Sequence, residues 1–291
     1  MTRALRTLAL LLGAACTRQS APSGPLVDDA GAAVHLAAPP RRIVSLIPAT
    51  TELVFALGAG DRLVGRTTWC DYPAAAATVP DLGNGIGPNL EAVIAARPDL
   101  VLLYHSGSNA PAADRLRSLG IAVLELRTDL IADLDRITKL LGGVLGRQQA
   151  ADSLLEWVHA DIAAATSPTS PTSPTSPTVF ILTWNRPPIT LGSGSYLSEI
   201  IALAGARNAF QELTAPSAPV SIEAVAQRNP DYILTSAEDL PDIARLPEWQ
   251  VVPAVRERRF VRVQGSEFNR PSPRIGSAIR ELRAALDSAR R

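Results

Sequence analysis

The sequence predicts an α/β protein of two lobes, each with a parallel central sheet, joined by a long connecting α-helix. Three observations predict this fold class. Short apolar runs rich in β-branched residues alternate with helical patterns along most of the chain. A proline-free segment of helical periodicity, residues 129–165, interrupts the alternation once. The chain has 291 residues, which suits two lobes of roughly 100–130 residues each.

The composition supports a packed core in both lobes and argues against one class of partner. Apolar residues make up 46% of the chain and charged residues 19%. The 28 basic and 28 acidic side chains balance, so the chain carries no electrostatic footprint for nucleic acid. Nucleic acid is therefore not an expected partner.

The N-terminus has the pattern of a secretion signal. Two arginines precede a short apolar run at residues 8–12, which cannot span a bilayer permanently. Small residues then lead to Cys16, in a context that resembles a bacterial lipobox. We expect residues 1–16 to be a signal peptide with Cys16 lipidated, and residues 17–40 to be a flexible tether rich in Ala, Pro and Ser. The alternative is ordinary signal cleavage nearby, with Cys16 discarded or left free.

The N-terminal lobe, residues 41–128, is predicted from a regular succession of strands and helices. The run "IVSLI" predicts its first strand, which Pro48 ends. Thr50 or Thr51 can cap the helix that follows. Further strands are predicted in "LVGRT", "LVLLY" and "IAVLEL", and further helices in "NLEAVIAAR" and "APAADRLRSLG".

The connecting helical segment and a low-complexity insert follow. Glycines at 142, 143 and 146 predict a break between two helices within residues 129–165, the second of them long. Residues 166–178 then repeat Ser-Pro-Thr. Every third residue there lacks an amide hydrogen, so neither helix nor strand can form. We expect an extended or disordered surface insert, with a proline-rich ligand segment as the alternative.

The C-terminal lobe, residues 179–291, resumes the alternation. Strands are predicted in "TVFILTW", "PDYILTS" and "RRFVRVQ", and helices in "SYLSEIIALAG", "SIEAVAQR" and "PRIGSAIRELRAALDSARR". The unit "SIEAVAQRNPDYILT" corresponds almost residue for residue to "NLEAVIAARPDLVLL" in the first lobe. This is a weak internal duplication, with one Glu-Ala-Val helix in each lobe.

Six segments resemble one family of proteins. They are "RIVSLIPATTELVFALG", "TTWCDYP", "PNLEAVIAARPDLVL", "WNRPPITLGSGSYLSEII", "PVSIEAVAQRNPDYIL" and "FNRPSPRIGSAI". Across residues 41–287 the chain resembles the periplasmic solute-binding proteins of the iron-siderophore, haem and vitamin B12 class. The segments "CDYP" and "RPSPRI" resemble its cobalamin-binding members most. The resemblance implies two Rossmann-like lobes joined by one long helix, with the ligand in the cleft between them.

Candidate ligand contacts follow predicted strands, where ligands of α/β sheets bind. A corrinoid is large, flat and mostly apolar, edged with amides, so it needs aromatic faces and a few polar groups. The residues that we expect at the cleft are Pro48, Trp69, Tyr104, Trp184, Ser217, Ser266, Phe268 and Arg270. The resemblance places Trp69, Tyr104 and Arg270 where the family contacts the corrin.

The chain departs from the cobalamin-binding pattern at two positions. Gly85 and Ser217 stand where that pattern has aromatic residues, which predicts a wider cleft or a different corrinoid. Trp69 has a packing role as its alternative, and Cys70 beside it is expected to be a small buried residue. Tyr104 next to His105 leaves open a role as iron ligands, which haem-binding relatives use.

Glu91 and Glu223 lie at the start of the two duplicated helices. The resemblance implies that one such glutamate in each lobe docks onto arginines of an ABC permease. The alternative is a favourable interaction of each carboxylate with the helix dipole. The two interpretations are compatible.

The resemblance implies a substrate-binding protein of an ABC importer, secreted across the inner membrane, periplasmic, and held at the membrane if Cys16 carries a lipid. It would capture cobalamin or another corrinoid and deliver it to the permease and its ATPase subunits. A haem or ferric-siderophore binder is the near alternative, and an enzyme on a two-lobe α/β scaffold the distant one. No catalytic set, zinc spacing or phosphate loop stands out in the sequence. We therefore expect no catalytic residue, no metal site and no cofactor besides the transported ligand.

Overall fold

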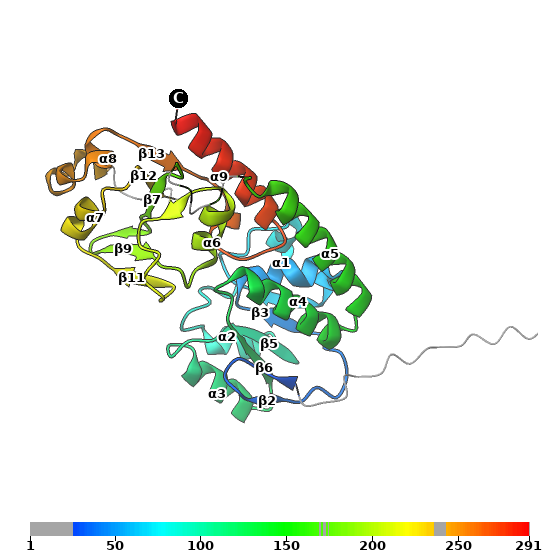
Figure 1. Cartoon of the computed structure of the whole chain (residues 1–291). Coiled ribbons are helices and arrows are strands. Elements are labelled where there is room, and N and C mark those ends of the chain that lie inside the picture. Colours follow the sequence, from blue (N-terminus) through cyan, green and yellow to red (C-terminus); the bar gives the residue numbers. More distant parts are fainter. Residues whose placement is uncertain (1–25, 169, 171–172, 174, 236–242, 291) are drawn as a thin grey trace, which may run out of the picture.

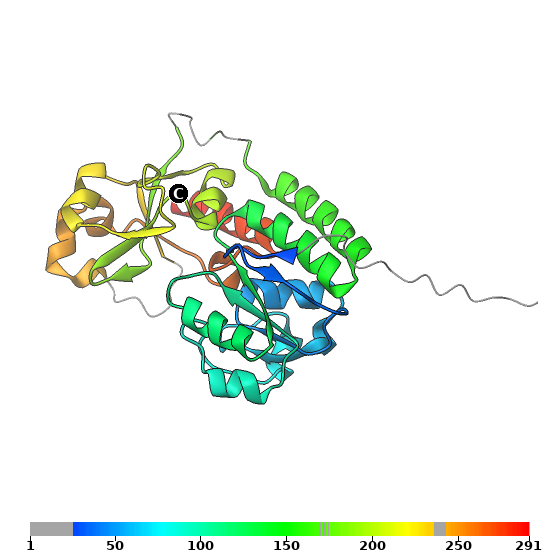
Figure 2. The same cartoon turned by 90° about the horizontal axis from the view of Figure 1, so that it is seen from below.

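The computed structural model describes residues 26–168, 170, 173, 175–235 and 243–290. The expected signal peptide, Cys16 and the first part of the expected tether lie outside these residues. The described residues form two lobes, with a row of helices along one flank (Figures 1 and 2). In this part of the chain, no helix has the length and apolar character needed to cross a membrane.

The N-terminal lobe is built on a four-stranded parallel sheet of order β4-β3-β5-β6. Its strands are β3 (Ile43–Ser45), β4 (Leu63–Arg66), β5 (Leu100–Tyr104) and β6 (Ala122–Leu126). Its helices are α1 (Pro48–Ala56), η1 (Gly60–Arg62), η2 (Ala74–Thr78), α2 (Leu90–Ala95) and α3 (Ala110–Ser118). Strands β3 and β5 are buried, as a parallel sheet covered by helices requires. The parallel order brings the carboxyl ends of β3, β4 and β5 to one edge of the sheet.

The C-terminal lobe holds a second parallel sheet of four strands, of order β10-β7-β12-β13. A three-stranded antiparallel sheet of order β11-β9-β8 accompanies it. The strands are β7 (Thr178–Ile181), β8 (Trp184–Asn185), β9 (Pro188–Leu191), β10 (Arg207–Asn208), β11 (Ser217–Pro219), β12 (Tyr232–Thr235) and β13 (Phe260–Arg262). The helices are α6 (Tyr196–Leu203), α7 (Ile222–Arg228), η3 (Ile243–Arg245), η4 (Pro247–Val251), α8 (Pro253–Arg256), η5 (Ser266–Phe268) and α9 (Ile275–Ala289).

The connecting segment is two helices, as the glycine pattern predicts. Helix α4 (Ile131–Leu145) ends at Gly146, whose φ of 67° needs the freedom of glycine, and α5 (Gln148–Ala165) follows. Helix α5 packs against α4 on one side and against α9 on the other (Figure 1). One apolar cluster runs from β3 and β5 through α4 and α5 to α6 and α9, so the lobes share a core.

The prediction of a flexible tether is wrong from residue 26 onward. Strand β1 (Leu26–Val27) pairs antiparallel with β2 (Ala33–Val34). Buried Asp28 accepts hydrogen bonds from the backbone amides of this turn. It also forms an ion pair with Arg117 of α3, at 2.6 Å. These contacts attach the turn to the N-terminal lobe, so the lobe begins before residue 41.

The prediction that Thr50 or Thr51 caps the first helix is also wrong. Pro48 itself occupies the first turn of α1, where its missing N–H costs nothing. Both threonines lie inside the helix and are buried, and their hydroxyls donate to the carbonyl of Ile47. Both hydroxyls also lie 2.8 Å from the hydroxyl of Ser45, the last residue of β3, so the threonines tie α1 to that strand.

The Ser-Pro-Thr insert is described only in part. Its described residues before β7 form neither helix nor strand. The Ser167 amide donates to the Leu203 carbonyl at 2.7 Å, and the buried Ser176 hydroxyl donates to the Ser170 carbonyl at 2.7 Å. The Ser167 bond ties the first end of the insert to the end of α6, and the Arg207 amide, which donates to the Pro177 carbonyl at 2.9 Å, ties the second end to β10.

Candidate functional site

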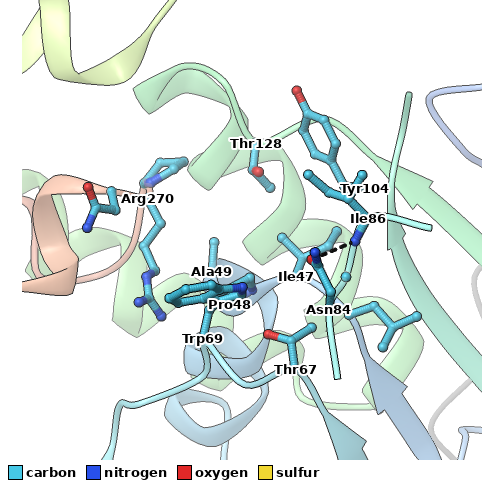
Figure 3. Close-up of a pocket in the computed structure, with 14 residues that line it drawn as sticks. Ile47, Pro48, Ala49, Thr67, Trp69, Asn84, Ile86, Tyr104, Thr128 and Arg270 are labelled. Atoms are coloured by element: carbon cyan, nitrogen blue, oxygen red, sulfur yellow. Dashed lines mark hydrogen bonds between the residues drawn. The ribbon is translucent and has the colours of Figure 1, made fainter. Parts of the chain in front are cut away.

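A cavity of about 380 Å³ opens at the carboxyl ends of β3, β4 and β5. Five segments of the N-terminal lobe line it, after β3, after β4, around Gly85, at Tyr104 and at Thr128, and residues 269–271 from the C-terminal lobe close it. Figure 3 shows these side chains gathered around the cavity from both lobes. The position agrees with the general rule for ligand sites in α/β sheets.

Trp69 lines this cavity with 64% of its surface exposed, while Cys70 beside it is 1% exposed. The Cys70 thiol lies 3.1 Å from the Thr51 hydroxyl and 3.2 Å from that of Thr67. The buried thiol therefore anchors the loop after β4 to α1 and to the end of the strand. With its neighbour anchored, Trp69 is left facing the cavity, as an aromatic platform for a flat ligand requires.

Tyr104 ends β5 and lines the cavity, with its hydroxyl donating to Asp129 at 2.7 Å. Burial and this hydrogen bond to a carboxylate raise the pKa of the Tyr104 phenol well above its usual value of 10. The Asp129 carbonyl in turn accepts from the Tyr196 amide of the C-terminal lobe at 2.6 Å. Tyr104 is thus a neutral phenol held at the crossing between the lobes.

The neighbouring His105 belongs to a different cluster. Its Nδ1 lies 3.4 Å from the buried Glu125, which also pairs with Arg117 at 3.0 Å. His105 is not part of the cavity lining. Within the described chain, no group of three or more His, Cys, Asp or Glu side chains is arranged to hold a metal ion.

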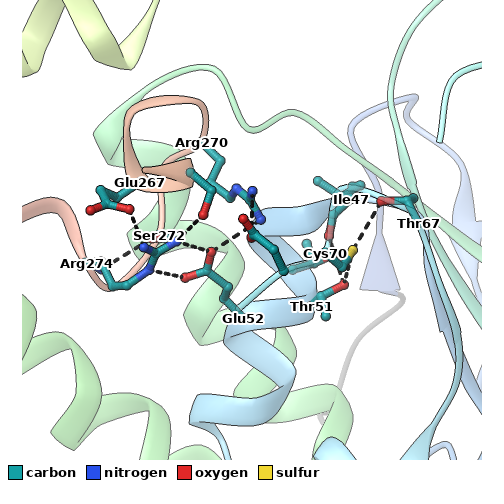
Figure 4. A network of polar contacts seen from close by, with 12 residues as sticks. Ile47, Thr51, Glu52, Thr67, Cys70, Glu267, Arg270, Ser272 and Arg274 are labelled. Atoms are coloured by element: carbon teal, nitrogen blue, oxygen red, sulfur yellow. Dashed lines mark hydrogen bonds and ion pairs between the residues drawn. The ribbon is translucent and has the colours of Figure 1, made fainter. Parts of the chain in front are cut away.

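A network of ion pairs joins the two lobes beside the cavity (Figure 4). Glu52 on α1, 2% exposed, accepts from Arg274 of the C-terminal lobe, with Nε–Oε2 at 3.0 Å and Nη2–Oε1 at 2.8 Å. Arg274 also pairs with Glu267, donates to the Ser266 hydroxyl at 2.9 Å, and stacks 4.2 Å above the Tyr72 ring. Arg274 therefore connects residues that lie far apart in the sequence.

Arg270 belongs to the same network and lines the cavity. Its Nη2 lies 3.0 Å from Asp71 Oδ1, and its Nη1 lies 3.5 Å from Glu52 Oε1. The side chain is buried. Two carboxylates of the N-terminal lobe thus hold a guanidinium of the C-terminal lobe in place.

The structure brings together four of the eight residues predicted at the cleft. Pro48, Trp69, Tyr104 and Arg270 line the cavity. Phe268 is 1% exposed and packs in the shared core, so the expectation that it offers a face to the cleft is wrong for this conformation.

The three other predicted cleft residues lie outside the cavity lining. Ser266 binds Arg274. Trp184 on β8 is exposed, with its Nε1 donating to the Arg186 carbonyl at 2.9 Å. Ser217 lies exposed on β11, and this small sheet lies on the side of the C-terminal lobe toward the N-terminal lobe (Figure 1).

Sequence reasoning missed Glu52, Asp129 and the reason for Gly85. A Cβ on Gly85 would lie 2.3 Å from the Leu46 carbonyl oxygen, so no larger residue fits there without displacing backbone. Glu52 gives a signal that could be used, since it is the one charged residue of its helix. Asp129 gives none, because its partner Tyr104 lies on a different element.

The two glutamates predicted to dock occupy equivalent positions in the two lobes. Glu91 follows the N-cap Asn89, whose side chain accepts from the Ala92 amide at 3.1 Å. Glu223 follows the N-cap Ser221, which accepts from the Ala224 amide at 3.1 Å. Both glutamates are exposed in the first turn of their helices, so each lobe presents one carboxylate in the same local geometry.

Residues 43–266 match the model of the periplasmic binding protein family, and the chain belongs to that family. The vitamin B12-binding protein of Vibrio parahaemolyticus is 28% identical over 258 residues, which cover 87% of this chain and 92% of the relative. An uncharacterized ABC transporter substrate-binding lipoprotein of Bacillus subtilis, YvrC, is 29% identical, covering 89% of this chain and 84% of the relative.

Two solved structures show the same fold. The vitamin B12-binding protein BtuF of Vibrio cholerae superimposes with a TM-score of 0.69 at 27% identity, covering 87% of this chain and 99% of its own. The haem-binding protein RhuT of Roseiflexus sp. RS-1, in apo form, superimposes with a TM-score of 0.76 at 25% identity, covering 86% and 99%. The protein is therefore an ABC-type periplasmic solute-binding protein of the vitamin B12, haem and siderophore class. Proteins of this class bind a small molecule and work with a permease and its ATPase.

Proposed function

We propose that this protein captures cobalamin or another corrinoid in the cavity between its lobes and delivers it to an ABC permease. The observation that carries the proposal is the cavity lining. It is mostly apolar, it presents the exposed ring of Trp69, and its one charged side chain, Arg270, is already paired with carboxylates. A flat, apolar, amide-edged ligand fits such a surface.

The volume is consistent with a ligand that protrudes from the cavity. About 380 Å³ lies at the lower end of the range of roughly 300–1,000 Å³ for ligand pockets. A corrinoid would rest one face on the N-terminal lobe and extend toward the C-terminal lobe. Exposed Trp184 on β8 would then be available as a second aromatic contact.

Haem is the second candidate, because RhuT shares the fold and because Tyr104 ends β5 and His105 follows it. Two features favour the corrinoid. An iron-ligating tyrosine is deprotonated, whereas the Tyr104 hydroxyl is bound to Asp129 and its pKa is raised. His105 faces Glu125 and lies outside the cavity lining.

Anchoring and docking complete the proposal. Lipidation of Cys16 would hold the mature protein at the membrane, and the Bacillus subtilis relative is itself named a lipoprotein. Glu91 and Glu223 would grip arginines on two permease subunits, because bidentate pairs with arginine are strong and directional.

Titration calorimetry on the purified mature protein tests the ligand. We expect cyanocobalamin to bind in a one-to-one complex and haemin to bind more weakly. Tight haemin binding with no heat from cyanocobalamin or dicyanocobinamide would overturn the proposal in favour of haem.

A further inference from the structure

Arg270 is the one charged side chain among the described residues that line the cavity. A free arginine at this point would attract carboxylate or phosphate groups of a ligand. This guanidinium is paired inside the protein instead: its Nη2 lies 3.0 Å from Asp71, and its buried Nη1, which makes no hydrogen bond, lies 3.5 Å from Glu52. Its side chain is 9% exposed, so its charge is compensated inside the protein rather than by solvent.

The surrounding network strengthens this compensation. Two guanidinium groups, those of Arg270 and Arg274, face the three carboxylates of Glu52, Asp71 and Glu267. The network therefore carries one net negative charge at neutral pH. This negative charge would repel a ligand carboxylate that approaches Arg270, whereas a neutral amide at the same place would not be repelled.

We propose that Asp71 is a specificity-determining residue, which makes the cavity discriminate against planar ligands whose edge carries carboxylates. The proposal rests on the proposed role of the cavity as the ligand site. Asp71 acts through Arg270, by occupying the guanidinium edge that a ligand carboxylate would otherwise take. Specificity of this kind comes from repulsion of the wrong ligand as much as from attraction of the right one.

Asp71 is the residue of the network that can be changed with least damage to the fold. Glu52 is buried and holds Arg274 through two hydrogen bonds, so its removal disturbs the joint between the lobes. The Asp71 side chain is 57% exposed, and water can take its place. Asp71→Asn keeps the shape of the side chain, removes its charge and replaces one carboxylate oxygen by an NH2 group.

The experiment compares two pairs of probes that differ in carboxylates alone. One pair is cyanocobalamin and its monocarboxylic acid, in which one propionamide is hydrolysed. The other pair is protoporphyrin IX and its dimethyl ester, which need no axial metal ligand. For each pair the measured quantity is the ratio of the dissociation constant of the acid to that of its neutral partner.

We expect Asp71→Asn to lower this ratio about tenfold, because one negative charge near the ligand edge is removed in a partly screened setting. Asp71→Glu keeps the charge and should keep the ratio of the wild type. Asp61→Asn makes the same change in net charge before β4, at the end of that strand away from the cavity, and should also leave the ratio unchanged.

An unchanged ratio in Asp71→Asn would overturn the inference, as would an equal shift for the acid and the neutral partner. Binding of neither pair would overturn it together with the proposed function. If only the porphyrin pair binds and its ratio falls, the inference stands and the corrinoid proposal fails. If cyanocobalamin binds the wild type but neither ratio moves, the corrinoid proposal stands and the role of Asp71 fails.

Discussion

At the scale of single residues, the neighbours Trp69 and Cys70 differ in exposure. The thiol is buried against two threonine hydroxyls, and the indole ring is exposed toward the cavity. Neither role needs a disulfide or a metal. A chain with 4% aromatic residues thus places one of its four tryptophans on a loop that a buried neighbour holds in place.

Replacing Trp69 by alanine should weaken the binding of cyanocobalamin roughly tenfold or more. Stacking on a flat ligand contributes about 0.5–1.5 kcal/mol beyond the apolar area that is buried. Calorimetry gives the affinity, and thermal melting should show an intact fold. Trp157→Ala is the matched control, because Trp157 is exposed on α5 and away from the cavity. If the two variants bind cyanocobalamin with equal affinity, Trp69 does not contact the ligand and has a packing role.

Tyr104 predicts a dependence of stability on alkaline pH. Its folded pKa is raised above the unfolded value of about 10, by burial and by the bond to Asp129. The stabilisation from this bond is therefore complete below about pH 10 and is lost as the pH rises toward the folded pKa. We measure the free energy of unfolding by urea at pH 8 and at pH 10.5. The decrease between these two pH values should be smaller for Tyr104→Phe than for the wild type. Parallel losses in both proteins would contradict this account of Tyr104.

At the scale of elements, the joint between α1 and the segment from η5 to α9 depends on a buried ion pair. Glu52→Gln should lower the free energy of unfolding by about 3–5 kcal/mol, because two guanidinium groups then lose a buried partner. Urea denaturation measures the change. Glu156→Gln, an exposed glutamate on α5, is the control and should change stability by less than about 0.5 kcal/mol. If Glu52→Gln also lowers the free energy of unfolding by less than about 0.5 kcal/mol, the lobes are held together by apolar packing alone.

The sequence predicts the elements that have a clear period and a clear stop. Helices α4 and α5 with their break at Gly146, and α2 with Asn89 at its start, are confirmed where the pattern places them. The pattern does not predict β1, β2, β8, β9, β10 or β11, because runs of two to four residues are too short to show a period. It also misplaces the start of α1, since two threonines, a residue type that favours N-caps, are buried inside the helix instead.

In the candidate site, the sequence predicts single residues at strand ends but not the contacts between residues that are distant in the sequence. Trp69 and Tyr104 can be located because the first follows β4 and the second ends β5. The bridge between Glu52 and Arg274 spans 222 positions of the sequence, so no local spacing contains it. Phe268 shows the opposite error, because the pattern locates its place after a strand and not the direction of its ring.

At the scale of the whole molecule, the duplicated helices α2 and α7 give each lobe one exposed glutamate at a helix start. Reversing both, Glu91→Arg with Glu223→Arg, should leave ligand affinity nearly unchanged, because neither residue lines the cavity. Transport into vesicles that contain the permease and ATPase should fall sharply, because like charges would meet at the docking surface.

The control reverses two exposed acids elsewhere, Asp61→Arg with Glu156→Arg, for the same change in net charge. If the glutamates serve only the helix dipole, the double reversal costs about 0.3–1 kcal/mol of stability at each site and transport stays normal. Normal transport would therefore rule out the docking role.

The central claim is that a corrinoid lies in the cavity between the lobes, against Trp69 and Arg270. The most direct measurement is the anomalous scattering of cobalt in crystals grown with cyanocobalamin. The account predicts one cobalt peak between the lobes, at the carboxyl ends of β3, β4 and β5. Crystals without a cobalt peak, or with a peak outside this cavity, would contradict it.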